Sequence, residues 1–158
     1  MKSSYSLSFL FVILTFISCD PVLDIGIDFS ASKDVVYLFC PGRSDNCVDT
    51  TIYFSKERLN LVKLSRSGNG HYSAFYAVGP GTLNSWFQYK WKADTVSLFL
   101  FDKETVDGST WETIVEEYLV LQRYDVTKKD LERLNCTLFY PPTEAMKGIR
   151  MYPRYEVK

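Results

Sequence analysis

The chemically most reactive side chains of this chain are four cysteines and a single histidine: Cys19, Cys40, Cys47, Cys136 and His71. A structural zinc site needs four ligands, usually in closely spaced pairs, and the chain has no CxxC pair. We therefore expect neither a metal site nor a cofactor. Cys40 and Cys47 flank the loop sequence PGRSDN and could form a disulfide if that loop brings two strand ends together. Spacing alone leaves two unbonded thiols equally open.

Cys136 lies in the apolar sequence LNCTLFY, which is typical of a strand. As a nucleophile its thiol would need a base, and His71 is the sole imidazole in the sequence. His71 follows the turn sequence GNG, where exposed residues are common. We interpret Cys136 as a small buried hydrophobic residue and His71 as a turn residue, and assign neither a catalytic role.

Carboxylates are numerous, but their spacing predicts no shared site. Asp102, Glu104 and Asp107 lie together in DKETVDG, which lacks the spacing of a calcium-binding EF-hand loop. Acidic turns are common because Asp favours turns. The chain has no G-x-S-x-G nucleophile sequence and no phosphate-binding loop ending in G-K-[ST]. No catalytic residue is predicted, and we expect a protein that is not an enzyme.

Aromatic residues are the remaining candidates for ligand contact. Trp86, Tyr89 and Trp91 lie in the sequence WFQYKWK, which also contains Lys90 and Lys92. Flat rings next to charge suit partner surfaces, including the faces of sugars. The alternative is that Phe87, Tyr89 and Trp91 simply cover the core, with Trp86 alone facing outward, and this packing interpretation is favoured.

The amino-terminal segment has the pattern of an export signal. Lys2 precedes the apolar run Leu7–Ile17, which is shorter than the roughly 20 residues of a membrane-spanning helix. The following sequence FISC resembles a lipobox, in which the cysteine receives fatty acids such as palmitate and becomes the first residue of the mature protein. This predicts a signal peptide over residues 1–18 and lipidation of Cys19. An ordinary signal peptide followed by a buried cysteine is the alternative.

A lipidated cysteine places the protein in a bacterial cell envelope, anchored most simply in the outer membrane. Two or three acyl chains hold a domain there firmly, because each buried methylene contributes about 0.8 kcal/mol. The sequence does not distinguish the periplasmic face from the cell surface. We interpret the acidic, Pro-started segment 19–33 as a lipidated tether and residues 34–158 as a single β-rich globular domain.

Composition and pattern predict a mainly β fold, a sandwich or an immunoglobulin-like sandwich or barrel. A formal net charge of −1 gives no indication of a nucleic-acid partner. Six strand patterns occur at short spacing, and the turn sequence SRSGNG predicts a hairpin of the third and fourth of them. The six segments are Asp34–Cys40, Val48–Phe54, Leu59–Leu64, His71–Val78, Trp86–Lys92 and Thr95–Phe101.

Two short helices are predicted in the last third of the chain. Ser109 and Glu112 form a capping box ahead of an apolar stripe at helical spacing. The stripe consists of Trp111, Ile114, Val115, Tyr118 and Leu119. Thr127 and Asp130 form a second cap, Asn135 suits the end of that helix, and a final strand over 136–140 stops at two prolines.

The stretch Leu121–Pro153 contains the sequences RYDVT, DLERLN, YPP and MYP. With the lipobox, these resemble small uncharacterised lipoproteins of gut Bacteroidetes. An aromatic residue is usual in those proteins at the position of Cys136, which supports a packing role for this residue. The resemblance implies an envelope location and no particular activity.

We expect a non-enzymatic envelope lipoprotein that binds a protein or a glycan, or supports another complex. The alternatives are a small envelope hydrolase that uses acidic residues and a purely structural lipoprotein. Two carboxylates about 5–10 Å apart in one cleft would favour the hydrolase.

Overall fold

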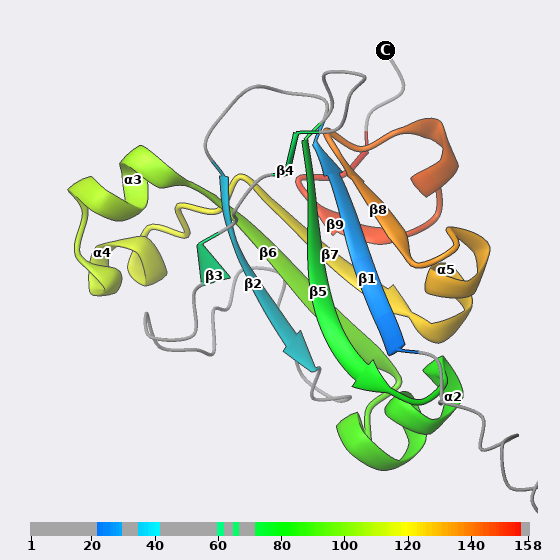
Figure 1. Ribbon diagram of the computed structural model, residues 1–158. Coiled ribbons are helices and arrows are strands. Elements are labelled where there is room, and N and C mark those ends of the chain that lie inside the picture. The colour runs from blue at the N-terminus through cyan, green and yellow to red at the C-terminus, as the bar shows by residue number, and fades with distance from the viewer. Residues whose placement is uncertain (1–21, 30–34, 42–59, 62–64, 67–71, 156–158) are drawn as a thin grey trace, which may run out of the picture.

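A computed structural model describes residues 22–29, 35–41, 60–61, 65–66 and 72–155 (Figure 1). The predicted signal peptide, Cys19, Cys47, His71 and the predicted strand Val48–Phe54 lie outside these residues. None of the helices described is long and apolar enough to cross a membrane.

The described strands form two sheets. The four-stranded sheet has the order β4-β5-β1-β8, made of β4 (Ser65–Arg66), β5 (Tyr72–Pro80), β1 (Val22–Phe29) and β8 (Thr137–Tyr140). The five-stranded sheet has the order β3-β2-β6-β7-β9, made of β3 (Asn60–Leu61), β2 (Val35–Pro41), β6 (Thr95–Asp102), β7 (Gln122–Thr127) and β9 (Arg150–Tyr152). The predicted mainly β fold with short helices is confirmed.

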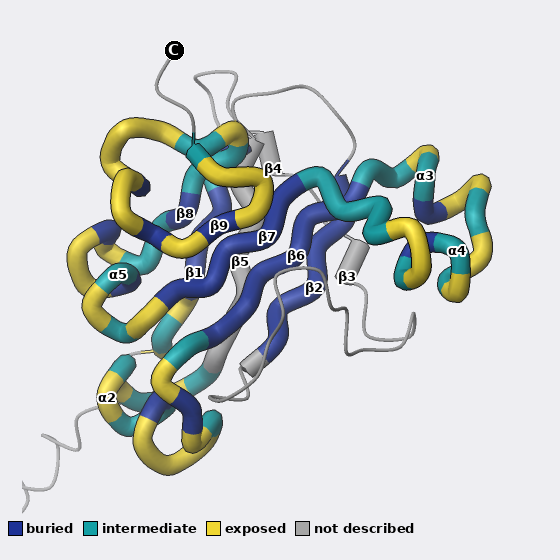
Figure 2. The backbone as a smooth tube through the Cα atoms, turned by 180° about the vertical axis from the view of Figure 1, so that it is seen from behind, coloured by how far each residue is buried: buried dark blue, intermediate teal, exposed yellow. Residues whose placement is uncertain are grey.

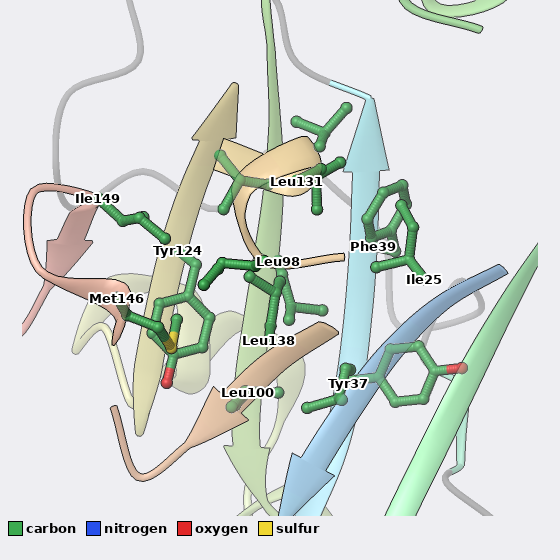
Figure 3. Packing of buried hydrophobic residues seen from close by; sticks show 14 of the residues in the cluster. Ile25, Tyr37, Phe39, Leu98, Leu100, Tyr124, Leu131, Leu138, Met146 and Ile149 are labelled. Carbon is green, nitrogen blue, oxygen red and sulfur yellow. The ribbon is translucent and has the colours of Figure 1, made fainter. Parts of the chain in front are cut away.

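The two sheets share one hydrophobic core, which Figure 3 shows from close by. Successive side chains of a strand point to opposite faces, so alternate residues of β1, β2, β6 and β7 meet between the sheets. Ile25 and Ile27 of β1 face Leu98 and Leu100 of β6 across this core, and all four are buried. The sheets therefore pack face to face as a sandwich.

The five-stranded sheet is also apolar on its outer face. Phe99 and Phe101 of β6 alternate with the residues that face the core, and both are completely buried. Helices α3 (Lys103–Gly108) and α4 (Trp111–Glu116) contribute Val106 and Ile114 to this second cluster. Figure 2 shows the buried strands β6 and β7, and α3 and α4 as a mixture of exposed and partly buried residues with one buried residue each. The strand predicted at Thr95–Phe101 is confirmed as β6.

The predicted tether is wrong for residues 22–29, which form β1 in the interior of the four-stranded sheet. β1 pairs antiparallel with β5 and parallel with β8. The sequence VLDIGIDF alternates buried apolar residues with Asp24, Gly26 and Asp28, which is the pattern of a strand. The two acidic residues gave the segment the composition of a linker. The folded unit therefore includes residues well before position 34.

The predicted strand Trp86–Lys92 is also wrong. Residues Leu83–Ser85 form helix α2, and Trp86–Trp91 continue it as the π-helix η3. Thr82 and Ser85 form a capping box, which satisfies free amide groups and favours the first helical turn. Gly79 and Gly81 adopt positive φ angles and end strand β5 just before this cap. The local cap thus overrides the β propensity of the aromatic residues.

The helix predictions are partly confirmed. Thr127 and Asp130 do form a capping box, at the start of helix α5 (Lys128–Arg133), and Asn135 ends that segment with a positive φ. The cap of α4 is Thr110, whose side chain accepts a hydrogen bond from the Thr113 amide, so the predicted Ser109 box is wrong. The apolar stripe that follows it packs on the second cluster as predicted.

The hairpin prediction is half right. β5 pairs with β4 at Ser65 and Arg66, rather than with the predicted strand Leu59–Leu64. The described part of that predicted strand, β3, pairs with β2 in the other sheet. Strands β7 and β9 and the 3-10 helix η4 (Glu144–Met146) were not predicted.

The position of β1 can be tested by truncating a buried side chain. Ile27→Ala should lower the free energy of unfolding by about 2–5 kcal/mol, because the side chain is 1% exposed between two sheets. Urea denaturation followed by circular dichroism measures this change. Val22→Ala is the control, since Val22 is 62% exposed in the same strand. Equal, small effects of both substitutions would show that residues 22–29 are not part of the core.

Candidate binding site: a basic pocket beside a buried ion pair

Strand β7 carries two charged residues on a buried face. Tyr124 and Val126 point into the core between the sheets, so Arg123 and Asp125 point to the outer face of the five-stranded sheet. Arg123 is 1% exposed and Asp125 is 8% exposed. Charged residues are almost never this buried unless they are paired.

The charges on β7 are satisfied by one another and by a neighbouring hydroxyl. The Arg123 Nε donates a hydrogen bond to Asp125 Oδ1 at 2.8 Å, and Ser97 Oγ of β6 donates to the same oxygen at 2.6 Å. The Arg123 guanidinium also lies 5.1 Å from the ring centre of Phe99, a cation–π contact. We call Ser97, Arg123 and Asp125 the β7 network.

Ionisation of the β7 network is governed by burial and pairing. Burial alone would lower the pKa of Arg123, but the hydrogen bond and charge of Asp125 outweigh it, so the pKa is raised. The Tyr118 hydroxyl is buried and faces Arg123, without a hydrogen bond of ordinary geometry in the described part of the chain. Burial raises the pKa of Tyr118, and the charge of Arg123 lowers it in part.

The β7 network extends to the surface through β9. The strands pair so that Asp125 stands opposite Arg150 and Arg123 opposite Tyr152. Arg150 Nε lies 3.6 Å from Asp125 Oδ2, although the Arg150 side chain is 61% exposed. Tyr152 packs edge-on against Tyr118, with ring centres 5.4 Å apart. One carboxylate on β7 therefore contacts both a buried and an exposed arginine.

A surface pocket of about 520 Å³ lies along β9, and we call it the β9 pocket. Its lining residues come from one continuous segment, namely Lys147, Gly148, Ile149, Arg150, Met151, Tyr152, Arg154 and Tyr155. Three of these side chains are cationic and two are phenols, and none of the described lining residues is acidic. Arginine donates hydrogen bonds in a planar fork that matches a carboxylate, so this lining suits an acidic ligand.

A second pocket, of about 550 Å³, lies where η3 meets the start of α5, and we call it the η3 pocket. It is lined by Asn84, Phe87, Gln88, Ala93, Asp94, Thr127, Lys128 and Lys129. Lys128 Nζ donates a hydrogen bond to Asn84 Oδ1 at 3.0 Å and so joins two segments that are distant in the sequence. Asp94 is the one carboxylate in this lining.

The aromatic residues predicted to contact a ligand do not form one exposed platform. The Trp91 ring packs against Phe87 at 4.9 Å and Phe39 at 5.7 Å, which secures η3 to the core. Trp86 lies 5.7 Å from Trp91, and its Nε1 donates a hydrogen bond to the Pro80 carbonyl. Both indoles are half-buried, whereas Tyr89 is 64% exposed. The packing interpretation is correct for Phe87 and Trp91 and wrong for Tyr89, and Trp86, expected to face outward, also packs against the core.

The cysteine predictions are tested only in part. Cys40 is buried in β2, while Cys47 lies outside the described residues, so their disulfide stays a prediction. Cys136 is partly buried against the core and sits in the turn between α5 and β8 rather than in the strand itself. Burial raises the pKa of its thiol, which disfavours the reactive thiolate.

The acidic cluster before α4 stabilises local structure. Asp102 caps α3 by accepting a hydrogen bond from the Thr105 amide at 3.0 Å, and Asp107 forms an ion pair with Lys103. Within the described residues, no group of three or more histidine, cysteine or acidic side chains could hold a metal ion. The predicted turn is a short helix, and its acids serve as a cap and a surface pair.

Sequence reasoning missed the β9 pocket. The tail MKGIRMYPRY holds three cations without an acid, a charge pattern that could have indicated it. The β7 network was not predictable in this way, because Arg123 and Asp125 look like surface residues until their strand is placed. The chain matches no protein-family model, no curated protein and no solved structure.

The energetic importance of the β7 network can be tested with Asp125→Ala. Removing this carboxylate leaves Arg123 charged and buried, and the free energy of unfolding should fall by about 3–5 kcal/mol. The matched control is Asp107→Ala, which breaks an exposed pair with Lys103 and should cost at most about 1 kcal/mol. Urea denaturation at neutral pH measures both, and equal losses would contradict the buried-pair assignment.

Proposed function

We propose that the protein is a lipid-anchored lipoprotein of the bacterial cell envelope, most simply of the outer membrane, whose domain binds an acidic ligand without catalysing a reaction. The anchor is the diacylglyceryl group on Cys19, supported by the lipobox sequence FISC and the short apolar run before it. The resemblance of the carboxyl-terminal segment to Bacteroidetes lipoproteins supports the same location.

The observation that carries the ligand assignment is the lining of the β9 pocket. Lys147, Arg150 and Arg154 surround it although the whole chain has a formal net charge of −1. Two tyrosines provide flat rings beside these charges, an arrangement that suits a sugar ring bearing a carboxylate. We therefore favour an acidic glycan as the ligand and keep an acidic segment of an envelope protein as the second candidate.

The β7 network contacts the β9 pocket through Arg150, a cationic side chain that could bind an acidic group. Asp125 already accepts two hydrogen bonds, from Arg123 and Ser97, so its charge is largely satisfied on the buried side. The Arg150 contact at 3.6 Å is longer than an ordinary hydrogen bond. Asp125 therefore holds the exposed, cationic Arg150 side chain over the sheet, at the lining of the β9 pocket.

A small hydrolase that uses acidic residues is the alternative function. Its chemistry needs two carboxylates facing one cleft. Among the described lining residues, the β9 pocket has no carboxylate and the η3 pocket has Asp94 alone. The geometry of these two pockets thus supports binding better than glycoside hydrolysis.

The anchor is tested by metabolic labelling with a palmitate analogue. Wild-type protein produced in a Gram-negative host should incorporate the label and fractionate with membranes. Cys19→Ala should lose the label, because the acyl group is attached to that sulfur. Cys136→Ala is the matched control and should keep it. Equal labelling of wild type and Cys19→Ala would refute the anchor.

Ligand binding is tested by calorimetry with three probes: oligogalacturonate, a neutral maltooligosaccharide and a polyglutamate peptide. We expect oligogalacturonate to bind and the neutral sugar not to bind. Arg154→Ala should weaken that binding about tenfold, as expected for one charge-assisted hydrogen bond. Lys103→Ala on α3 is the matched control for lost charge and should have no effect. Binding of polyglutamate alone would favour the protein ligand, and binding of none of the three would contradict the proposal.

A further inference from the structure

The start of β1 fixes which end of the sandwich is closest to Cys19. Val22 pairs with Pro80 and Leu23 with Gly79, at the end of β5. Pro80 leads directly into α2 and η3, and the Trp86 side chain donates a hydrogen bond back to the Pro80 carbonyl. In Figure 1 the blue strand β1 begins beside α2. We call this region, comprising Val22, α2, η3 and the first turn of α5, the η3 end.

Chain length limits how far the η3 end can lie from a lipid on Cys19. Only Asp20 and Pro21 separate Cys19 from Val22. Three residue steps reach at most about 11 Å, whatever conformation they adopt. The headgroup layer of a bilayer is itself about 5–8 Å thick on each side, and an acylated cysteine lies near its inner boundary. The η3 end must therefore stand at the headgroups.

The exposed side chains of the η3 end match that environment. Val22 is 62% exposed and Tyr89 is 64% exposed, and large apolar or aromatic side chains are otherwise rarely this accessible in the described residues. Tyrosine is enriched at membrane interfaces, where its ring contacts the acyl boundary and its hydroxyl stays in water. Both residues thus have a physical reason to be exposed at this end and not elsewhere.

The charge of the η3 end favours anionic headgroups. Lys90, Lys92 and Lys129 are exposed there, and Lys128 is partly exposed. The acids of the same region are Asp24 and Asp94, which are exposed, Asp130, which caps α5, and Glu132, which lies 3.6 Å from Lys128. Two of these four acids are thus engaged within α5, and the three exposed lysines outnumber the other two. Each lysine near an anionic bilayer surface strengthens attachment, within a Debye length of the lipid charges.

We propose that the η3 end is a docking surface for an anionic phospholipid bilayer, with Tyr89 and Val22 at the interface and Lys90, Lys92 and Lys129 on the headgroups. This inference rests on the proposed anchor at Cys19. It deepens the proposed function because it fixes an orientation. The β9 pocket lies along β9, an edge strand of the five-stranded sheet, and shares no lining residue with the η3 end. It therefore stays accessible to a ligand.

The docking surface is tested by lysine footprinting of the lipidated protein. The full-length precursor is expressed in a Gram-negative host, and the mature protein is purified from its membranes and bound to phosphatidylethanolamine/phosphatidylglycerol vesicles. A membrane-impermeant acetylating reagent then labels exposed lysines, which mass spectrometry quantifies relative to the same protein in detergent. Lys103 on α3 and Lys147 in the β9 pocket serve as internal references.

We expect acetylation of Lys90, Lys92 and Lys129 to fall about fivefold on these vesicles, while Lys103 and Lys147 change little. Lys90→Glu should restore much of the labelling at Lys92 and Lys129, and the matched variant Lys103→Glu should not. Vesicles of phosphatidylcholine alone should protect the three lysines less, because the charge attraction is missing.

Two results would overturn the inference in distinguishable ways. If intact-mass analysis of the same preparation shows no acyl chains, the proposed anchor fails and the docking surface fails with it. If the protein is acylated but all lysines are labelled equally on vesicles and in detergent, the anchor stands and the docking surface alone is refuted. Protection of Lys147 in place of Lys90 would equally contradict this orientation.

Discussion

The pairing of β1 between β5 and β8 is the constraint on which the rest of the structure depends. Through its parallel pairing with β8, this strand joins the amino-terminal part of the chain to the carboxyl-terminal part. The Gly26 amide donates a hydrogen bond to the Cys136 carbonyl at 2.8 Å, just where the turn after α5 enters β8. Ile25, Ile27 and Phe29 then supply, together with Leu138 of β8, the described side chains that the four-stranded sheet buries in the core. Without β1, the inner faces of β2, β6 and β7 would lose three of their buried contacts, Ile25, Ile27 and Phe29.

The same pairing determines what each end of the sandwich can do. Because β1 starts beside Pro80, the η3 end lies next to the predicted lipidation site. Strands β7 and β9 belong to the five-stranded sheet. Their residues Tyr124 and Met151 are buried in the core, and this packing holds the outer face of both strands in place. The Tyr124 hydroxyl donates to the Phe139 carbonyl of β8 at 2.8 Å, so the two sheets are also joined by a hydrogen bond. The proposed membrane contact and the proposed ligand site therefore belong to one sandwich with a shared core but to different parts of its surface.

The sequence predicts those elements whose local pattern and tertiary role agree. β2 and β6 are nearly continuous apolar runs, and the Thr127 box marks the start of α5 correctly because a cap depends on only a few neighbouring residues. β1 was missed because its outward residues are acidic, which resembles a linker when the partner strands are unknown. β7 was missed for a related reason, since Arg123 and Asp125 are buried as a pair and the sequence cannot show that they meet. At η3, the aromatic residues suggested a strand, but the Thr82 cap and the glycines before it favoured a helix.

We infer that the folded domain begins within three residues of Cys19, the proposed site of the anchor. Neutron reflectometry of the lipidated protein on a supported anionic bilayer tests this claim most directly. We predict protein density that continues from the headgroup layer without an intervening layer of water. A free linker over residues 19–33 could reach roughly 50 Å. A water layer tens of ångströms thick between the headgroups and the domain would contradict the placement of β1 and the orientation that follows from it.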